Sequence, residues 1–376
     1  MSAAPEILAN PLEETPLSQM RGAGAATVGY RGALTPLAYS SLDAKPTGHP
    51  QHAELAALTT GAGIFDLGYM ESLRITGADR VRWLNGMVTN TIKALPEWHW
   101  NYSLVLNPQG RIQGDVNVYC APDTLFLETD RAQMGRLTAH LRRYIIMDKV
   151  ELAPVDDGRT LIGIAGPKAA EILSNLGAAV PEEGAFAEAR FHGAEVILAH
   201  AYSPLVPRFE LLVGADALGT VWDAMRDSRA EACGVRAMEA LRILEGTPLY
   251  GVDILDKHLA QETGQARAMN FTKGCYLGQE IVERVRSRGN VHRVLKQFAV
   301  ENAPAGLEPG QTLELNAEGA ERNPVGELTS LAHYALPSFT GALALGFIRT
   351  EAVESKLPLR YEGGAVTILD APPALQ

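Results

Sequence analysis

The character of the sequence changes near residue 290, and this change is the feature that most constrains the fold. Before it, segments with strand-like alternation are mixed with segments whose apolar residues recur every three or four positions, as in helices. After it, short strand-like runs are separated by Gly-, Pro- and Asn-rich turns, without helical spacing. The mixed part favours an α+β class rather than a regular parallel repeat, and residues 290–376 favour a small all-β barrel or sandwich.

A chain of 376 residues is long for one domain, so we expect two or three. Residues 1–50 are predicted to form an N-terminal extension, polar over 1–15 and an irregular Gly-, Ala- and Pro-rich arm over 22–50. The main body is expected over 51–289. Within it, the spacing of apolar residues predicts a helix over 79–92, and Asp130 is predicted to cap another helix.

The net charge of −11 argues against broad binding to nucleic acid or to an anionic membrane. No secretory signal and no apolar run of eighteen residues are visible, so we expect a cytoplasmic protein that does not span a bilayer. Three scattered cysteines without a Cys-x-x-Cys spacing suggest a reducing compartment. The histidines show no ligand pattern, and no metal site is predicted.

The segment 111–120 is a predicted strand with one polar face. Because strand side chains alternate, Asp115, Asn117 and Tyr119 lie on the side opposite Val116 and Val118. A carboxylate, an amide and a phenol on one face can line a site for a polar ligand. The alternative is the water-facing side of an antiparallel strand.

The segment 273–280 reads Lys-Gly-Cys-Tyr-Leu-Gly-Gln-Glu and precedes an amphipathic helical pattern over 281–288. Cys275 thus comes just before a helix N-terminus, with Lys273 two residues away. The helix dipole and a nearby cation both favour a thiolate, which makes Cys275 a candidate reactive thiol. A buried, inert cysteine is the alternative on residue chemistry alone.

The same eight residues resemble the signature of the YgfZ family. These are folate-binding proteins implicated in iron–sulfur protein maturation, and they are related to the T-protein (aminomethyltransferase) of the glycine cleavage system. Four further segments resemble T-protein segments in the same order, and they lie at 62–70, 107–115, 161–173 and 240–251. The resemblance implies a T-protein-like multi-domain folate-binding fold, with two α+β lobes at about 51–150 and 151–289 and a C-terminal β-barrel over 290–376.

Carried over residue by residue, the resemblance implies a site for tetrahydrofolate or a one-carbon derivative. Asp115 matches the catalytic aspartate near the reacting folate nitrogens. Glu210 resembles the glutamate that holds the pterin, and Arg242 resembles the arginine near the acidic end of the ligand, for which the exposed arginines of 284–288 are further candidates. The remaining implied contacts are Met70, Tyr102, Asn117 and Tyr119. For Glu210 and Arg242, a structural ion pair is the alternative that the residues alone leave open.

The resemblance implies a protein that binds tetrahydrofolate and supports the assembly or repair of iron–sulfur clusters in client enzymes. Cys275 and Lys273 are its expected catalytic residues, together with Asp115. Two alternatives stay open: a folate-dependent aminomethyl or methyl transferase, and a non-catalytic scaffold with a vestigial folate site. The segment 202–210 lacks the glycines and acids of the T-protein loop, and a T-protein has no cysteine matching Cys275. Both departures favour the YgfZ branch. The predicted partners are a folate and iron–sulfur client or assembly proteins; the oligomeric state is open.

Overall fold

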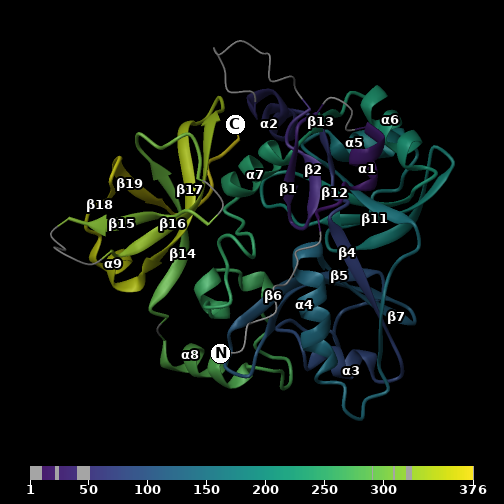
Figure 1. The fold of residues 1–376 in the computed structure, drawn as a ribbon, viewed down its shortest axis with the longest axis horizontal. Coiled ribbons are helices and arrows are strands. Elements are labelled where there is room, and N and C mark those ends of the chain that lie inside the picture. Colours follow the sequence, from purple (N-terminus) through teal and green to yellow (C-terminus); the bar gives the residue numbers. More distant parts are fainter. Residues whose placement is uncertain are drawn as a thin grey trace.

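The computed structural model describes residues 11–21, 25–39, 51–289, 291–307, 310–318 and 324–375. Figure 1 shows three β-structures grouped around the middle of the molecule: a six-stranded sheet, a five-stranded sheet and a closed C-terminal barrel. The predicted α+β class with a terminal β-barrel is confirmed. Among the described helices, none has the length and apolarity needed to cross a membrane.

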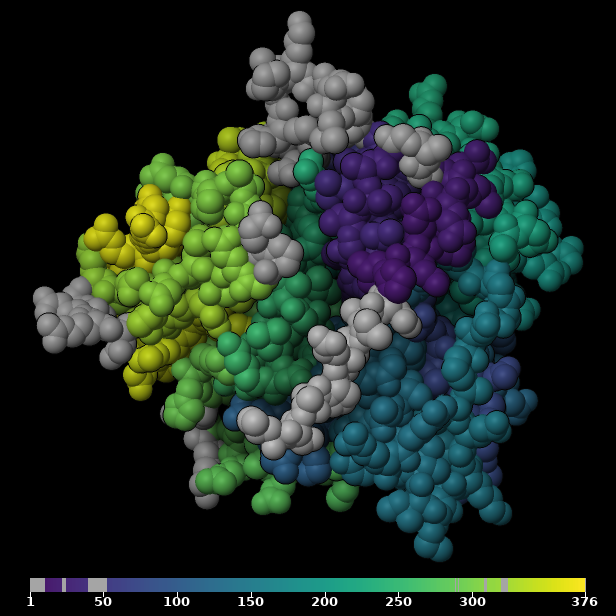
Figure 2. Space-filling model, in the orientation of Figure 1, coloured from purple at the N-terminus to yellow at the C-terminus, as the bar shows by residue number. Residues whose placement is uncertain are grey.

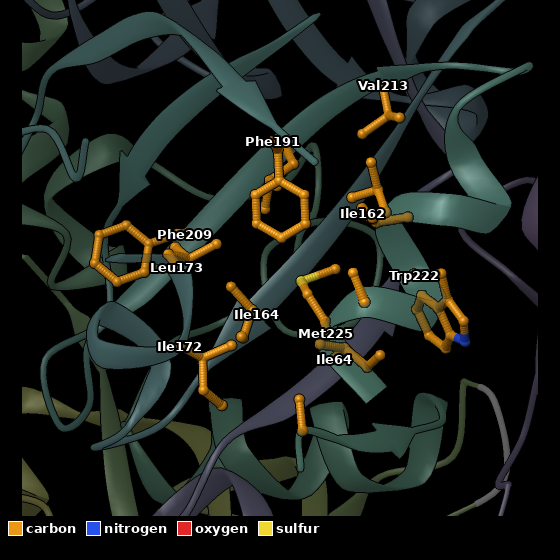
Figure 3. Packing of buried hydrophobic residues seen from close by; sticks show 14 of the residues in the cluster. Ile64, Ile162, Ile164, Ile172, Leu173, Phe191, Phe209, Val213, Trp222 and Met225 are labelled. Atoms are coloured by element: carbon orange, nitrogen blue, oxygen red, sulfur yellow. The ribbon is translucent and has the colours of Figure 1, made fainter. Parts of the chain in front are cut away.

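The six-stranded sheet lies between two pairs of helices. Its strands, in spatial order, are β10 (Phe186–Phe191), β11 (Ala194–Ala201), β12 (Arg208–Gly214), β9 (Arg159–Ala165), β3 (Gly63–Asp66) and β13 (Glu231–Cys233). One face packs on α5 (Ala169–Asn175) and α6 (Leu218–Asp227), where aromatic and aliphatic side chains fill the space in between (Figure 3). The other face packs on α2 (Gln51–Thr60) and α7 (Val235–Leu244).

Gly163 shows why the middle of this sheet is tightly specified. A Cβ atom on Gly163 of β9 would lie 2.1 Å from Cε2 of Phe65, which stands on the neighbouring strand β3. The ring therefore lies directly over the glycine, and any side chain there would displace it.

The α-helices that pack on the five-stranded sheet in the described part of the chain lie on its apolar face. The strand order is β5 (His99–Leu106), β6 (Ile112–Ala121), β7 (Thr124–Asp130), β4 (Met70–Thr76) and β8 (Glu151–Pro154). The apolar face packs on α3 (Arg80–Asn85) and α4 (Arg131–Arg142). As predicted, Asp130 caps α4, and its carboxylate accepts the backbone N–H of Gln133 at 3.1 Å.

The barrel closes in the order β14 (Arg293–Val300), β17 (Thr340–Arg349), β16 (Gly326–Ala335), β15 (Leu313–Ala317), β18 (Leu359–Tyr361) and β19 (Gly364–Leu369). Two buried side chains of the barrel donate hydrogen bonds to carbonyls of α7. The Gln297 amide donates to the Ile243 and Leu244 carbonyls at 2.6 and 2.9 Å, and the Tyr334 hydroxyl donates to the Ala240 carbonyl at 2.7 Å. These bonds satisfy carbonyls at the end of a buried helix.

The described part of the N-terminal arm is ordered. Residues 11–39 contain α1 (Pro16–Arg21) and a hairpin of β1 (Thr27–Tyr30) and β2 (Ala33–Pro36), where the sequence predicts an irregular segment. Figure 2 shows this segment, in purple, lying across the six-stranded lobe. Leu17 and Ala33 are fully buried, so burial of small apolar side chains fixes the arm although its sequence lacks a strand-like pattern. The rest of the arm lies outside the described residues.

Two further predictions of local structure are wrong. The predicted helix over 79–92 ends at Asn85, because the Asn85 side chain accepts the backbone N–H groups of Ile92 and Lys93 at 2.9 and 3.3 Å and turns the chain back. The terminal region, predicted without helices, contains the short α9 (Thr350–Ser355) between β17 and β18. Strands β8, β10, β13 and β15 were also not predicted. They are short or half exposed, so their patterns are weak.

Candidate functional site

The face of the five-stranded sheet opposite α3 and α4 carries the predicted polar side chains. Along β6, buried and half-buried residues alternate as predicted. The register places Tyr102 of β5 opposite Asn117, and Asn117 opposite Glu128 of β7, so these side chains share a face with Asp115 and Tyr119. We call the following set the polar site: Tyr102, Asp115, Asn117, Tyr119, Glu128 and Glu210.

Asp115 is held by two side chains from neighbouring elements. The Tyr102 hydroxyl donates to one carboxylate oxygen at 2.9 Å, and the Gln133 amide donates to the other at 2.9 Å. Gln133 also donates to Asp130 at 3.0 Å, so the N-terminus of α4 fixes its position. Both carboxylate oxygens of Asp115 are therefore held in one orientation on a half-buried strand face. A group that transfers or holds a proton requires such a fixed orientation.

Glu128 is a buried carboxyl group that the sequence analysis did not select. Its side chain accepts from the Asn117 amide and from the Tyr119 hydroxyl, both at 3.3 Å. Burial raises the pKa of Glu128 to about 8, and the nearby Glu210 carboxylate contributes to the rise. At neutral pH, Glu128 is therefore largely a neutral acid, which can donate a hydrogen bond as well as accept one.

Glu210 comes from β12 of the other sheet and is buried beside this carboxyl group. Arg208 donates to its Oε1 from two nitrogens, at 2.7 and 3.1 Å, and the guanidinium lies over the Phe65 ring. Oε2 of Glu210 has no hydrogen bond from the described residues. Burial also raises the pKa of Glu245, at the end of α7, to about 7, and Ser203 donates to this carboxyl group. The two sheets thus meet at a group of buried acids balanced by arginine.

A second arginine lies next to the polar site. Arg267, in the short 3₁₀ helix η2 (Ala266–Ala268), lies over the rings of Tyr102 and Tyr202, 4.0 Å from each centroid. Tyr202 belongs to the loop between β11 and β12. Nε of Arg267 is buried without a hydrogen-bond partner. One face of the Tyr102 ring, an expected folate contact, is thereby covered by a cation.

The loop with Cys275 lies against the other end of β5 and β6. Tyr276 joins an apolar cluster that includes Tyr102, while Cys275 is exposed. Lys273 donates to the backbone carbonyls of Asn85, Val88 and Asn90, at 2.6, 2.6 and 2.5 Å. Burial lowers the pKa of Lys273 to about 7, whereas three carbonyl acceptors favour the ammonium form, which alone has three N–H donors.

Lys273 is therefore placed as an anchor of the loop. The following helix α8 (Gln279–Arg288) begins four residues after Cys275, with Gly278 as its N-cap at φ 81°. A Cβ at Gly278 would lie 2.6 Å from the Asn107 carbonyl oxygen, so this glycine permits the loop to approach the β5–β6 turn. The exposure of Cys275 differs from the buried, inert alternative.

Of the two remaining predicted ligand residues, Arg242 is engaged in ion pairs and Met70 lies at the end of the polar face. Arg242 donates to Glu239 at 2.9 and 2.5 Å, to Asp253 at 2.8 Å and to Ser330 at 2.9 Å. This is the structural ion pair that the sequence left open as an alternative. Met70 begins β4 opposite Asp130, and because Ser72 of the same strand lies opposite Glu128, Met70 lies on the sheet face that carries the polar site; its side chain also packs against the cluster of α2, α7 and β3.

Sequence reasoning missed Glu128, Arg208, Gln133, Tyr202 and Arg267. Only Glu128 carries a local signal, since it follows the apolar run 125–127 in a predicted strand, where a carboxylate is unexpected. The others reach the site from distant segments. The two remaining cysteines, Cys120 and Cys233, are buried. Among the described residues, no group of three or more His, Cys, Asp or Glu is arranged to hold a metal ion.

Comparison with known proteins gives a match to the family model of the GCVT N-terminal domain over residues 17–273, more than half of the chain. An aminomethyltransferase of Exiguobacterium sibiricum is 25% identical over 331 residues, covering 85% of this chain and 89% of that protein. One of Deinococcus deserti is 30% identical over 253 residues, covering 65% and 68%. A putative chloroplastic transferase of Arabidopsis thaliana is 25% identical over 302 residues, covering 79% and 68%.

The fold is also similar to a solved structure. The crystal structure of glycine cleavage system aminomethyltransferase T from Bartonella henselae superposes with a TM-score of 0.83 at 20% identity, covering 96% of this chain and 98% of that one. The predicted T-protein-like fold is thereby confirmed over nearly the whole chain, including the barrel.

Proposed function

Because the chain belongs to the GCVT family, we propose that it binds tetrahydrofolate, or a one-carbon derivative of it, at the polar site and acts as a folate-dependent aminomethyl or methyl transferase. The observation that carries the proposal is the convergence of Asp115 on β6 with buried Glu128 and Glu210 from two sheets. The names of the relatives favour the transferase, since several are aminomethyltransferases.

The donor set of the polar site fits a pterin. A pterin presents adjacent N–H donors along one edge, and a carboxylate can accept two of them. Arg208 occupies Oε1 of Glu210, and Oε2 is left without a bond from the described residues. Glu128, largely neutral, can donate to a pterin nitrogen or carbonyl that accepts. These two groups would bind the ring, with Asn117 and Tyr119 orienting Glu128.

Asp115 has the position of a proton-holding group. A bound tetrahydrofolate supplies nitrogens that carry a one-carbon unit. Asp115 would accept a hydrogen bond from such a nitrogen and hold its proton, while Tyr102 and Gln133 keep the carboxylate in one orientation. Closure of the site by the two sheets would limit access of water to the reactive group.

Binding and turnover test the proposal separately. Calorimetry with tetrahydrofolate should give binding to the wild type and a roughly tenfold or greater loss for Glu210→Gln, because the charged acceptor is removed. Asp115→Asn should bind folate and fail to transfer the aminomethyl group of a lipoyl-bound donor. Absence of folate binding by the wild type contradicts the proposal and supports a scaffold with a vestigial site. Binding without turnover of an aminomethyl or methyl donor contradicts the transferase alone.

A second function is favoured by Cys275. The YgfZ-like signature places an exposed thiol on a loop anchored through Lys273, and a transferase of the T-protein type has no use for it. In this alternative, the folate-bound protein supports the assembly or repair of iron–sulfur clusters in client enzymes, and Cys275 is the reactive thiol. Cells with Cys275→Ala should then lose the activity of a cluster-dependent enzyme, while the purified variant binds tetrahydrofolate normally. Full client activity in those cells contradicts this role; Cys120→Ala, at a buried cysteine, is the matched control.

A further inference from the structure

Arg267 is a half-buried cation with no ion pair to a carboxylate among the described residues, and its Nε is fully buried. This nitrogen has no hydrogen-bond partner in the described parts of the chain. Taking a charge out of water without a partner is costly. The acidic groups near it have other partners: Tyr102 and Gln133 hold Asp115, and Ser203 donates to Glu245.

Two of the other arginines considered for a ligand's acidic end are already engaged. Arg242 is surrounded by Glu239, Asp253 and Ser330. Arg286 on α8 pairs with Glu283 and lies over the Phe271 ring. Arg267, by contrast, retains donors for a ligand beside the polar site, as far as the described residues show.

The surroundings of Arg267 favour one kind of ligand group. Two tyrosine rings lie 4.0 Å from its guanidinium carbon, so aromatic rings, and not carboxylates, occupy the positions beside the cation. The donors along the guanidinium edge match the two oxygens of a carboxylate. The Tyr102 ring lies against the guanidinium and its hydroxyl donates to Asp115, so Tyr102 links the cation to the proposed reacting end of the site.

We propose that Arg267, held by Tyr102 and Tyr202, binds a carboxylate of the glutamyl tail of the folate. This inference rests on the proposed folate binding and extends it by naming the residue that selects the tail. It replaces the role expected for Arg242. It also gives a use to the loop 202–207, where the sequence departs from the T-protein pattern, because that loop supplies Tyr202.

Two ligands that differ only in the tail test the proposal. Calorimetry is performed with tetrahydrofolate and with tetrahydropteroate, which has the same pterin and aminobenzoate but no glutamate. Wild type should bind tetrahydrofolate roughly ten- to a hundredfold more tightly than tetrahydropteroate, and Arg267→Gln should remove this preference. Arg190→Gln, at an exposed arginine of β10 for which no ligand role is considered, is the matched control and should behave as wild type.

The outcomes separate this inference from the folate proposal. If wild type binds neither ligand, folate binding itself is contradicted. If wild type binds both and Arg267→Gln keeps the tail preference, the role of Arg267 is contradicted.

If Arg267 served only to stabilise the fold, its removal would lower the urea midpoint of unfolding. Under the proposal, removing this unpaired charge should leave the urea midpoint of the ligand-free protein unchanged or higher. The proposal is contradicted if both Arg267→Gln and Arg267→Met lower the urea midpoint and either variant still prefers tetrahydrofolate to tetrahydropteroate. Tyr202→Phe, which keeps the ring beside the cation, should retain the preference, whereas Tyr202→Ala should weaken it.

Discussion

Glu128 provides a stability test of the polar site that needs no ligand. Its pKa is raised from 4.5 to about 8, mainly by burial. The folded state therefore holds a proton that the unfolded state releases, and stability falls as the pH rises through this interval. At 1.36 kcal/mol per pH unit, the full interval corresponds to about 5 kcal/mol. This contribution is fully present below pH 4.5 and lost by about pH 8.

Glu128→Gln should remove this dependence. Glutamine has the shape of the neutral acid, and its carbonyl can accept the same hydrogen bonds from Asn117 and Tyr119. Urea unfolding at pH 5, 6, 7, 8 and 9 should show the variant gaining on wild type by about 1.4 kcal/mol per pH unit between pH 5 and 8. Glu188→Gln, at an exposed position of β10, should remain parallel to wild type. Parallel curves for Glu128→Gln and wild type would refute the buried-acid reasoning.

Three other substitutions test individual contacts. Gly163→Ala should destabilise by about 1–3 kcal/mol in thermal unfolding, because the new methyl group overlaps the Phe65 ring; an unchanged Tm would contradict that packing. Arg242→Met should cost about 3–5 kcal/mol, because it leaves the fully buried Asp253 without its cation, yet the folate tail preference should persist. A lost preference would restore Arg242 as a ligand residue. Lys273→Met should speed hydrogen exchange over residues 85–90, since three carbonyls lose their donor; unchanged exchange would contradict the anchoring role.

Much of the fold could be predicted because its signals are local. The cap at Asp130, the alternation along β6 and the loss of helical spacing after residue 290 depend on neighbouring residues. Where the prediction failed, contacts from distant residues decided the structure. The predicted helix over 79–92 is cut short by the Asn85 side chain and by Lys273, which lies 188 positions further along the chain.

For the candidate site, sequence could select side chains on one strand but not their partners. Asp115, Asn117 and Tyr119 share a face because of the period of a strand. Glu210 is brought beside Glu128 only by the meeting of two sheets, which no local pattern encodes. In the same way, the ion pairs of Arg242 and the free donors of Arg267 depend on the tertiary arrangement, so sequence alone could not tell which arginine remains available.

The segment around Asn90 links the thiol loop to the polar site. Asn90 accepts from Lys273 through its carbonyl, at 2.5 Å, and its side chain donates to the carbonyls of Tyr102 and Arg267 at 3.1 and 2.9 Å. Thr89 donates to the Ala268 carbonyl at 2.6 Å. The backbone that carries both Arg267 and its tyrosine partner is therefore attached to the same segment as Lys273. It follows that a weaker tetrahydrofolate affinity in Lys273→Met, with Cys275→Ala unaffected, reports displacement of this segment and not a chemical role of the thiol.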